Sequence, residues 1–259
     1  MISGVSTACL YPMETEKALR SLAEEGVKNT EIFVNSHCEL QGPYLGDMLD
    51  CIREYGLNIT SVHPYTCGVE PMMLFTAYER RLNDMIGYYK RFFEFMGKVG
   101  AKYFILHGNK PENSFPPEAE FENFAKLQTA AREMGVEVLR ENVVRCTSGK
   151  LSFMLEMKKY LGDMGAFVLD TKQAVRAGED PIEIAKALGG SIKHIHYSES
   201  GKNGDCLPCG CGDRDPAVFF ETLKSVGFDG AVILELYADG YTGGAKALAE
   251  NSRMIAQYL

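Results

Sequence analysis

The sequence lacks an excess of basic residues, because 27 lysines and arginines stand against 35 aspartates and glutamates, a net charge of −8 at pH 7. A surface of that sign repels phosphate backbones, so we expect no nucleic-acid partner. The chain also lacks any apolar run of the roughly 18–20 residues that span a bilayer. Its amino end lacks a basic stretch followed by an apolar one. We therefore expect a cytoplasmic protein with no membrane partner.

A disulfide framework is lacking as well. The eight cysteines are scattered over 259 residues, unlike the regular spacing of small secreted domains. We predict that most are reduced thiols. The exception is the Gly/Pro-rich loop with Cys206, Cys209 and Cys211, which could bind a metal or form a disulfide. Because a structural metal site usually needs four ligands, we interpret it as a loop that is merely rich in cysteine.

Strand-like and helix-like segments alternate along the whole chain. The predicted strands cover residues 2–7, 30–34, 58–63, 102–107, 136–141, 166–170, 192–197 and 231–235. The predicted helices cover residues 13–25, 44–55, 77–99, 118–134, 151–161, 180–188, 215–226 and 245–258. Eight such pairs predict an α/β fold, a single (β/α)8 TIM-barrel domain over residues 1–259. A doubly wound sheet competes, but Ser6–Cys9 offer no Gly-rich phosphate turn after the first strand.

The last four predicted strands each carry an acid or a histidine at their last or next-to-last position: Glu141, Asp170, His196 and Glu235. In a barrel, the carboxyl ends of the strands converge on the active site. A lone acid after a strand is usually a helix N-cap. Three carboxylates and an imidazole at one point, however, need a cation to offset their charge. We therefore predict that these four residues bind one divalent metal ion.

The other histidines receive separate interpretations. His63 and His107 end the third and fourth strands, so we expect them to contact substrate hydroxyls, with a buried structural role as the alternative. His194 shares a strand face with His196 but lies deeper, which favours a supporting role. His37 is expected at the surface. The Gly-x-Gly at residues 210–212 is interpreted as a turn before a helix capped by Asp215, and not as a phosphate cradle.

These residues resemble the sugar phosphate isomerase/epimerase superfamily of xylose isomerase-like TIM barrels. The likeness rests on Glu141-Asn142, Leu169-Asp170, His194-Ile195-His196 and the stretch from Gly210 to Glu235, and it covers essentially the whole chain. The resemblance implies that Glu141, Asp170, His196 and Glu235 bind one Mn, Mg, Co or Zn ion. It also implies that Glu141 and Glu235 shuttle a proton. Relatives often dimerise, so a homodimer is a further expectation.

The chain departs from the ketose 3-epimerases in the residues that surround their substrate. Those enzymes use a histidine three residues after the aspartate, a glutamate six after the first glutamate and an arginine six after the metal-binding histidine. Here these places hold Gln173, Thr147 and Lys202. Arg145 matches an arginine that epimerases carry four residues after the first glutamate. We still expect Arg145, Gln173 and Lys202 to contact substrate, while free ketohexoses are in doubt. Arg145 and Lys202 could meet a phosphate or carboxylate, with a solvated surface charge as the alternative for each.

We predict a metal-dependent isomerase or epimerase of a small sugar, polyol or sugar phosphate. Glu141 and Glu235 would remove and return a proton next to a carbonyl, through a metal-bound enediolate. The alternatives are a dehydratase of a cyclic polyol or its acid, of the inosose or dehydroshikimate type, and a non-catalytic binder on the same fold. Endonuclease IV, in the same superfamily, uses five histidines for three zinc ions. This acidic chain has five in all, so a nuclease is not expected.

Overall fold

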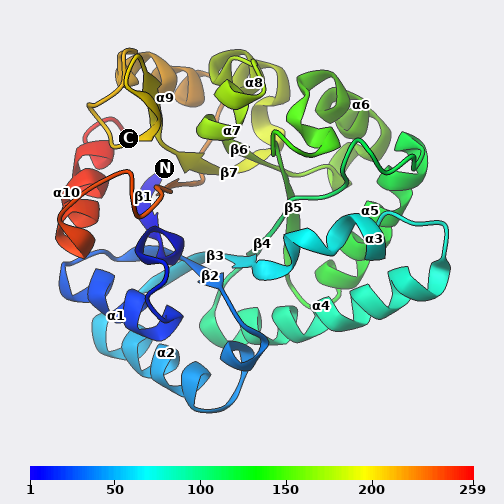
Figure 1. The fold of residues 1–259 in the computed structure, drawn as a ribbon, viewed down its shortest axis with the longest axis horizontal. Helices are drawn as coiled ribbons and strands as arrows, with labels where there is room; N and C mark the ends of the chain where they lie inside the picture. The colour runs from blue at the N-terminus through cyan, green and yellow to red at the C-terminus, as the bar shows by residue number, and fades with distance from the viewer.

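The computed structural model describes residues 1–259, and eight parallel strands close into a barrel in the order β1-β10-β7-β6-β5-β4-β3-β2 (Figure 1). The barrel strands are β1 (Ile2–Ser6), β2 (Asn29–Val34), β3 (Asn58–Pro64), β4 (Tyr103–Leu106), β5 (Glu137–Glu141), β6 (Phe167–Asp170), β7 (Ile192–Tyr197) and β10 (Ala231–Leu234). Each strand end lies within one residue of its prediction. The predicted (β/α)8 barrel is confirmed.

The helices form an outer ring around the strands (Figure 1). They are α1 (Thr15–Glu24), α2 (Gly42–Tyr55), α3 (Glu70–Met73), α4 (Glu79–Val99), α5 (Pro117–Arg132), α6 (Leu151–Leu161), α7 (Thr171–Arg176), α8 (Pro181–Leu188), α9 (Pro216–Ser225) and α10 (Gly244–Ala256). The short helices α3 and α7 were not predicted, and α7 matters because it begins directly after Asp170. None of the helices is long and apolar enough to cross a bilayer.

A small antiparallel hairpin between β7 and α9 was also missed. Its strands are β8 (Glu199–Gly201) and β9 (Gly204–Leu207). The loop after it supports the turn interpretation, because the backbone N–H groups of Gly210 and Gly212 donate to the carboxylate of Glu199. Asp215 then caps α9 by accepting the N–H of Ala217. The eight cysteines are free thiols, including the three in this loop.

Strand alternation arranges the barrel interior in layers, because every second side chain of a strand points inward. Two residues before the polar strand ends lies a layer in which every residue is fully buried: Ser61, Ile105, Leu139, Val168, His194 and Ile233. Its apolar part comes from β4, β5, β6 and β10, whereas β3 and β7 supply a hydroxyl and an imidazole. Below the strand ends the barrel interior is therefore filled by buried side chains, which are apolar except on β3 and β7.

Candidate metal centre

Four side chains meet at the carboxyl end of the barrel, and we call them the mouth cluster: Glu141, Asp170, His196 and Glu235. Their ligand atoms all lie within 4.8 Å of one another. Glu141 ends β5, Asp170 ends β6, and Glu235 directly follows β10. Asp170 and His196 are direct partners in the register of β6 and β7. The parallel barrel thus brings together the four residues that the sequence selected as metal ligands.

Two carboxylate oxygens of the mouth cluster are buried without a hydrogen-bond partner. Asp170 caps α7, since its Oδ1 accepts the N–H of Gln173 at 2.9 Å, but its Oδ2 accepts no hydrogen bond. Glu141 Oε2 also accepts none, although Nε2 of His107 lies 3.0 Å away in a direction unsuited to one. Buried carboxylate oxygens without donors are costly, and a cation is the partner that removes the cost.

The pKa values of the mouth cluster also indicate that its carboxylates need a cation. Burial raises the pKa of Asp170 to about 7, and the nearby charges of Glu141 and Glu235 contribute to the rise. Burial alone would also raise the pKa of Glu141, but His107 and His196 hold it well below its usual range. Three carboxylates in one buried place therefore do not ionise independently, as expected for a site that needs positive charge.

The donor set fits a divalent cation. Three carboxylates supply hard oxygen ligands, and His196 supplies a nitrogen whose Nδ1 lies 3.2 Å from Glu141 Oε1 and 3.7 Å from Glu235 Oε2. Mixed oxygen and imidazole ligands suit Mn²⁺, Mg²⁺, Co²⁺ or Zn²⁺. Together with the unpartnered oxygens, this chemistry makes the mouth cluster a fitting metal site.

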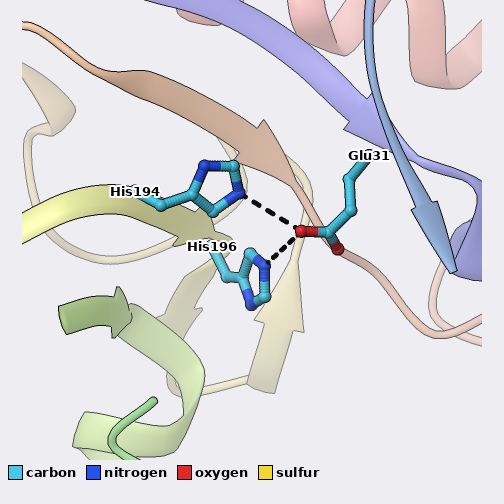
Figure 2. A group of neighbouring side chains, drawn as sticks. All are labelled: Glu31, His194 and His196. Atoms are coloured by element: carbon cyan, nitrogen blue, oxygen red, sulfur yellow. Dashed lines mark hydrogen bonds and ion pairs between the residues drawn. The ribbon is translucent and has the colours of Figure 1, made fainter. Parts of the chain in front are cut away.

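Glu31 of β2 lies beneath the mouth cluster, and it was not predicted from the sequence. Its Oε2 lies 3.0 Å from Nε2 of His196 and 3.2 Å from Nε2 of His194, so both imidazoles point at one oxygen (Figure 2). The hydroxyls of Ser61 and Ser6 donate to the same carboxylate. Burial alone would raise the pKa of Glu31, yet His196 and His194 hold it well below its usual range.

This contact fixes which nitrogen of His196 faces the mouth. A carboxylate can only accept, so Nε2 of His196 carries the hydrogen that points at Glu31. Nδ1 lies 3.2 Å from Glu141 Oε1, which also only accepts, so Nδ1 carries a hydrogen here as well and would offer its lone pair once a cation replaces that hydrogen. Orientation of a metal-binding imidazole by a carboxylate behind it is a common arrangement. A supporting role beneath the metal ligands was predicted for His194, which is fully buried. Glu31 contacts both His194 and His196 and so supports the mouth cluster from the same depth.

Lys172 is the second residue of this site that was not predicted from the sequence. It lies in the first turn of α7, and its side chain is only 4% exposed. Its Nζ is 3.0 Å from Glu235 Oε2 and 3.4 Å from Asp170 Oδ2. A lysine in a helix is normally a solvated surface charge. Only the fold shows that the ammonium group of Lys172 lies in the barrel mouth.

His63 and His107 form a pair beside the cluster. Nδ1 of His63 lies 3.0 Å from the Pro64 carbonyl oxygen, and its Nε2 lies 2.9 Å from Nε2 of His107. Because a carbonyl only accepts, Nδ1 of His63 carries the hydrogen and its Nε2 accepts from His107. Together with Glu141 the pair forms a second group whose ligand atoms lie within 4.8 Å. His63 is buried and stacks on Phe33, whereas His107 is partly exposed at the mouth.

The remaining predicted substrate residues lie at the edge of the site or outside it. Gln173 stands on α7, and its Oε1 accepts the N–H of Val144. Arg145 and Lys202 are exposed, and their charged groups make no hydrogen bond or ion pair. Lys202 lies between the two strands of the β8–β9 hairpin. The structure does not bring Arg145 and Lys202 into the mouth cluster, so their contact with substrate stays a prediction.

His37 lies partly exposed at the surface, but it has partners that the sequence did not show. Its ring is half-buried, stacks on Tyr88 and lies 3.2 Å from the Tyr88 hydroxyl through Nδ1. Its Nε2 is 3.4 Å from a guanidinium nitrogen of Arg91. Both partners stand on α4, which is distant in sequence and could not be paired with the His37 loop from the sequence alone.

Comparisons with known proteins agree with the barrel fold. Residues 19–258 match the family model described as xylose isomerase-like TIM barrel. Among curated proteins, the uncharacterized protein ML2432 of Mycobacterium leprae (strain TN) is 23% identical over 281 residues, covering 99% of this chain and 94% of its own. The uncharacterized protein Rv0498 of Mycobacterium tuberculosis (strain ATCC 25618 / H37Rv) matches with the same identity and coverage.

Solved structures share the fold. A D-tagatose 3-epimerase-like protein has a TM-score of 0.81 at 17% identity, covering 100% of this chain and 97% of its own. A D-allulose 3-epimerase from Methylomonas sp., solved in complex with D-allulose, has a TM-score of 0.77 at 15% identity, with coverages of 100% and 97%. The IolI protein with a bound zinc atom has a TM-score of 0.76 at 20% identity, with coverages of 100% and 99%.

Proposed function

Because the chain belongs to the xylose isomerase-like TIM-barrel family, we propose that it is a metal-dependent isomerase or epimerase of a small sugar, polyol or sugar phosphate. The observation that carries the proposal is the mouth cluster, with its ligand atoms within 4.8 Å and its unpartnered buried oxygens. Two structural neighbours support it by their names, since one holds zinc and another holds D-allulose.

In this proposal Glu141, Asp170, His196 and Glu235 hold one divalent ion, either Mn, Mg, Co or Zn. The bound ion would polarise the substrate carbonyl and offset negative charge that develops on it. Glu31 holds His196 by its Nε2 and so keeps Nδ1 directed at the mouth. Asp170 is fixed from the other side, because its Oδ1 is tied to the start of α7.

The proton would be moved by the two glutamates. Glu141 on β5 and Glu235 after β10 are separated around the barrel by β6 and β7, so they approach the mouth from different directions. One carboxylate would remove the proton next to the carbonyl, and the other would return it. Each glutamate then needs one oxygen for the proton, which requires monodentate contact with the ion.

Substrate contacts would come from residues around the mouth. His107 is partly exposed, and its Nε2 is held near Glu141 by the buried His63. Gln173 has a side-chain amide at the edge of the cluster. Arg145 and Lys202 would reach only a substrate that extends beyond the mouth. That residues 1–259 form one domain is also proposed, supported by closure of the barrel between β1 and β10. A homodimer and a cytoplasmic location stay predictions.

The test is proton exchange in deuterated water. The protein with added Mn²⁺ is incubated with a panel of keto sugars, polyol ketones and their phosphates, and deuterium at the carbon next to the carbonyl is followed by NMR. Exchange with at least one compound, lost after chelation, is expected. No exchange with any compound, together with metal-independent ligand binding, would favour the non-catalytic binder. Ultraviolet absorbance from an unsaturated product would favour the dehydratase.

The group formed by His63, His107 and Glu141 motivates one further assay. A second metal ion in that group would resemble the multi-metal arrangement of a nuclease more than a one-ion isomerase. Cleavage of DNA that contains an abasic site would therefore be measured in parallel. We expect none, since the surface is acidic.

A further inference from the structure

Lys172 places an ammonium group against the mouth cluster. Its Nζ lies 3.0 Å from Glu235 Oε2 and 3.4 Å from Asp170 Oδ2, and its side chain is 4% exposed. The position follows from the sequence spacing, because Asp170 caps α7 and Lys172 lies in its first turn, two residues later. A buried ammonium this close to two carboxylates is a counter-charge and not a solvated surface group.

No other lysine or arginine contacts the cluster. The remaining ion-pair partners of Glu141 and Glu235 are the imidazoles of His63, His107 and His196. Arg176, on the same helix as Lys172, instead binds both carboxylate oxygens of Asp205 at 2.6 and 2.7 Å. Lys172 is therefore the one permanently cationic side chain that the chain supplies to these acids.

Tyr237 offers the ammonium a second contact. Nζ of Lys172 lies 4.7 Å from the centre of the Tyr237 ring, a cation–π distance. The ring is held in place by Arg176, whose Nη1 donates to the Tyr237 hydroxyl at 2.9 Å. This aromatic face attracts a cation without using any oxygen of the mouth cluster. An ammonium that left Glu235 and Asp170 would thus keep one of its partners.

We propose that Lys172 is the internal counter-cation of the mouth cluster and that a divalent ion must displace it from Glu235 and Asp170 in order to bind. The inference rests on the metal site of the proposed function. Ammonium and metal ion compete for the same oxygens, and they repel each other at such distances. Lys172 therefore stabilises the metal-free protein and weakens metal binding, while the Tyr237 ring, 4.7 Å from Nζ, is the partner that the displaced ammonium keeps.

The test replaces the charge and keeps the length of the side chain. Lys172→Met removes the ammonium, and Lys172→Gln serves as a second neutral variant. Lys186→Met is the matched control, because Lys186 forms an exposed ion pair with Glu183 and its loss changes the net charge equally. For each variant, Mn²⁺ binding is measured by titration calorimetry and the melting temperature is measured in EDTA.

We expect both neutral variants to bind Mn²⁺ at least about tenfold more tightly than the wild type, roughly 1.4 kcal/mol. Their melting temperatures in EDTA should fall, and the rise in melting temperature on adding Mn²⁺ should grow. Lys186→Met should match the wild type in both measurements. If Lys172→Met and Lys172→Gln bind Mn²⁺ with wild-type or weaker affinity, the inference is wrong while the proposed function stands. If neither the wild type nor any variant binds a divalent ion, the proposed function fails and this inference with it.

Tyr237→Leu tests the second contact. Loss of the aromatic face should weaken Mn²⁺ binding in the wild-type background, because the displaced ammonium has no partner. In the Lys172→Met background the same substitution should leave the affinity unchanged. Equal weakening in both backgrounds would overturn this part of the inference, since Tyr237 would then act on the metal site without Lys172.

Discussion

Two buried groups of polar side chains lie one above the other in the barrel, and they differ in how completely the chain pairs their carboxylate oxygens. In the lower group, which we call the interior cluster (Glu31, Ser6, Ser61 and His194), the carboxylate of Glu31 receives two hydroxyls and two imidazoles. In the mouth cluster, one oxygen of Asp170 and one of Glu141 have no donor. His196 belongs to the mouth and joins the two through its opposite ring nitrogens.

The difference indicates what each group does. A buried carboxylate whose oxygens are paired, like that of Glu31, stabilises the fold, whereas one with an unpaired oxygen is costly unless something else completes it. In the interior cluster only Nδ1 of His194 lacks a partner. The interior cluster therefore holds the strands and orients His196. The mouth cluster is arranged for a partner from outside the chain. Substitutions in the two groups should accordingly separate stability from function.

The largest expected effect is on catalysis at the mouth. Glu235→Gln keeps the size of the side chain but removes a base and a metal ligand. We expect proton exchange on an accepted substrate to fall by about 10²–10⁴, the usual contribution of a general base. Glu183→Gln, an exposed glutamate of α8, is the control and should exchange at the wild-type rate. A Glu235→Gln variant with unchanged exchange would remove this residue from the mechanism.

The next effect is on stability, in the interior cluster. Glu31→Ala leaves His194, His196 and two hydroxyls without their common acceptor. Removal of one partner of a buried charged pair costs about 3–5 kcal/mol. We expect that loss in urea unfolding with EDTA, at an unchanged slope. A loss below about 1 kcal/mol would show that the interior cluster does not hold the fold, and the contrast drawn here would fail.

A smaller loss is expected for Ser61→Ala. The hydroxyl of Ser61 donates to Glu31 at 2.7 Å, and a hydrogen bond to a charged group is worth about 1.5–3 kcal/mol. Ser198 gives a matched control, because its hydroxyl is also buried but has no hydrogen-bond partner. Ser198→Ala should cost nothing measurable in the same unfolding experiment. Equal losses for the two serines would mean that burial, and not the bond to Glu31, sets the effect.

The smallest change in stability is expected at the mouth, for Asp170→Asn. Asparagine still caps α7 through its side-chain oxygen, and the substitution removes a charge whose pKa burial raises to about 7. We expect the free energy of unfolding in EDTA to change by less than about 1 kcal/mol. Mn²⁺ binding should weaken at least about tenfold, as measured by calorimetry. A destabilisation as large as that of Glu31→Ala would contradict the contrast between the two groups.

The two groups also differ in how well their residues could be predicted from the sequence. Glu141, Asp170, His196 and Glu235 stand at strand ends, where position along the strand alone predicts convergence. Glu31 lies inside β2, and its partners on β1, β3 and β7 are known only once the barrel closes. An acid in an otherwise buried strand was its one signal. Lys172 gave no signal at all, because α7 was not predicted and a helical lysine ordinarily points to solvent.

The fold could be predicted from the sequence more completely than the structure of the loops. Long periodic helices and short apolar strands gave the barrel with bounds close to those observed. The β8–β9 hairpin was missed because its strands are three and four residues long and show no alternation that distinguishes them from a loop. Arg145 and Lys202 were selected by resemblance to epimerases, and sequence spacing cannot tell that both are exposed and that neither forms an ion pair with the mouth cluster.

The most direct test of the central claim is anomalous diffraction from crystals grown with Mn²⁺, with data collected at the manganese edge. We predict one anomalous peak per chain, within about 2.0–2.6 Å of oxygens of Glu141, Asp170 and Glu235 and of Nδ1 of His196. Absence of a peak between these four side chains, or a peak held only by His63 and His107, would contradict the account.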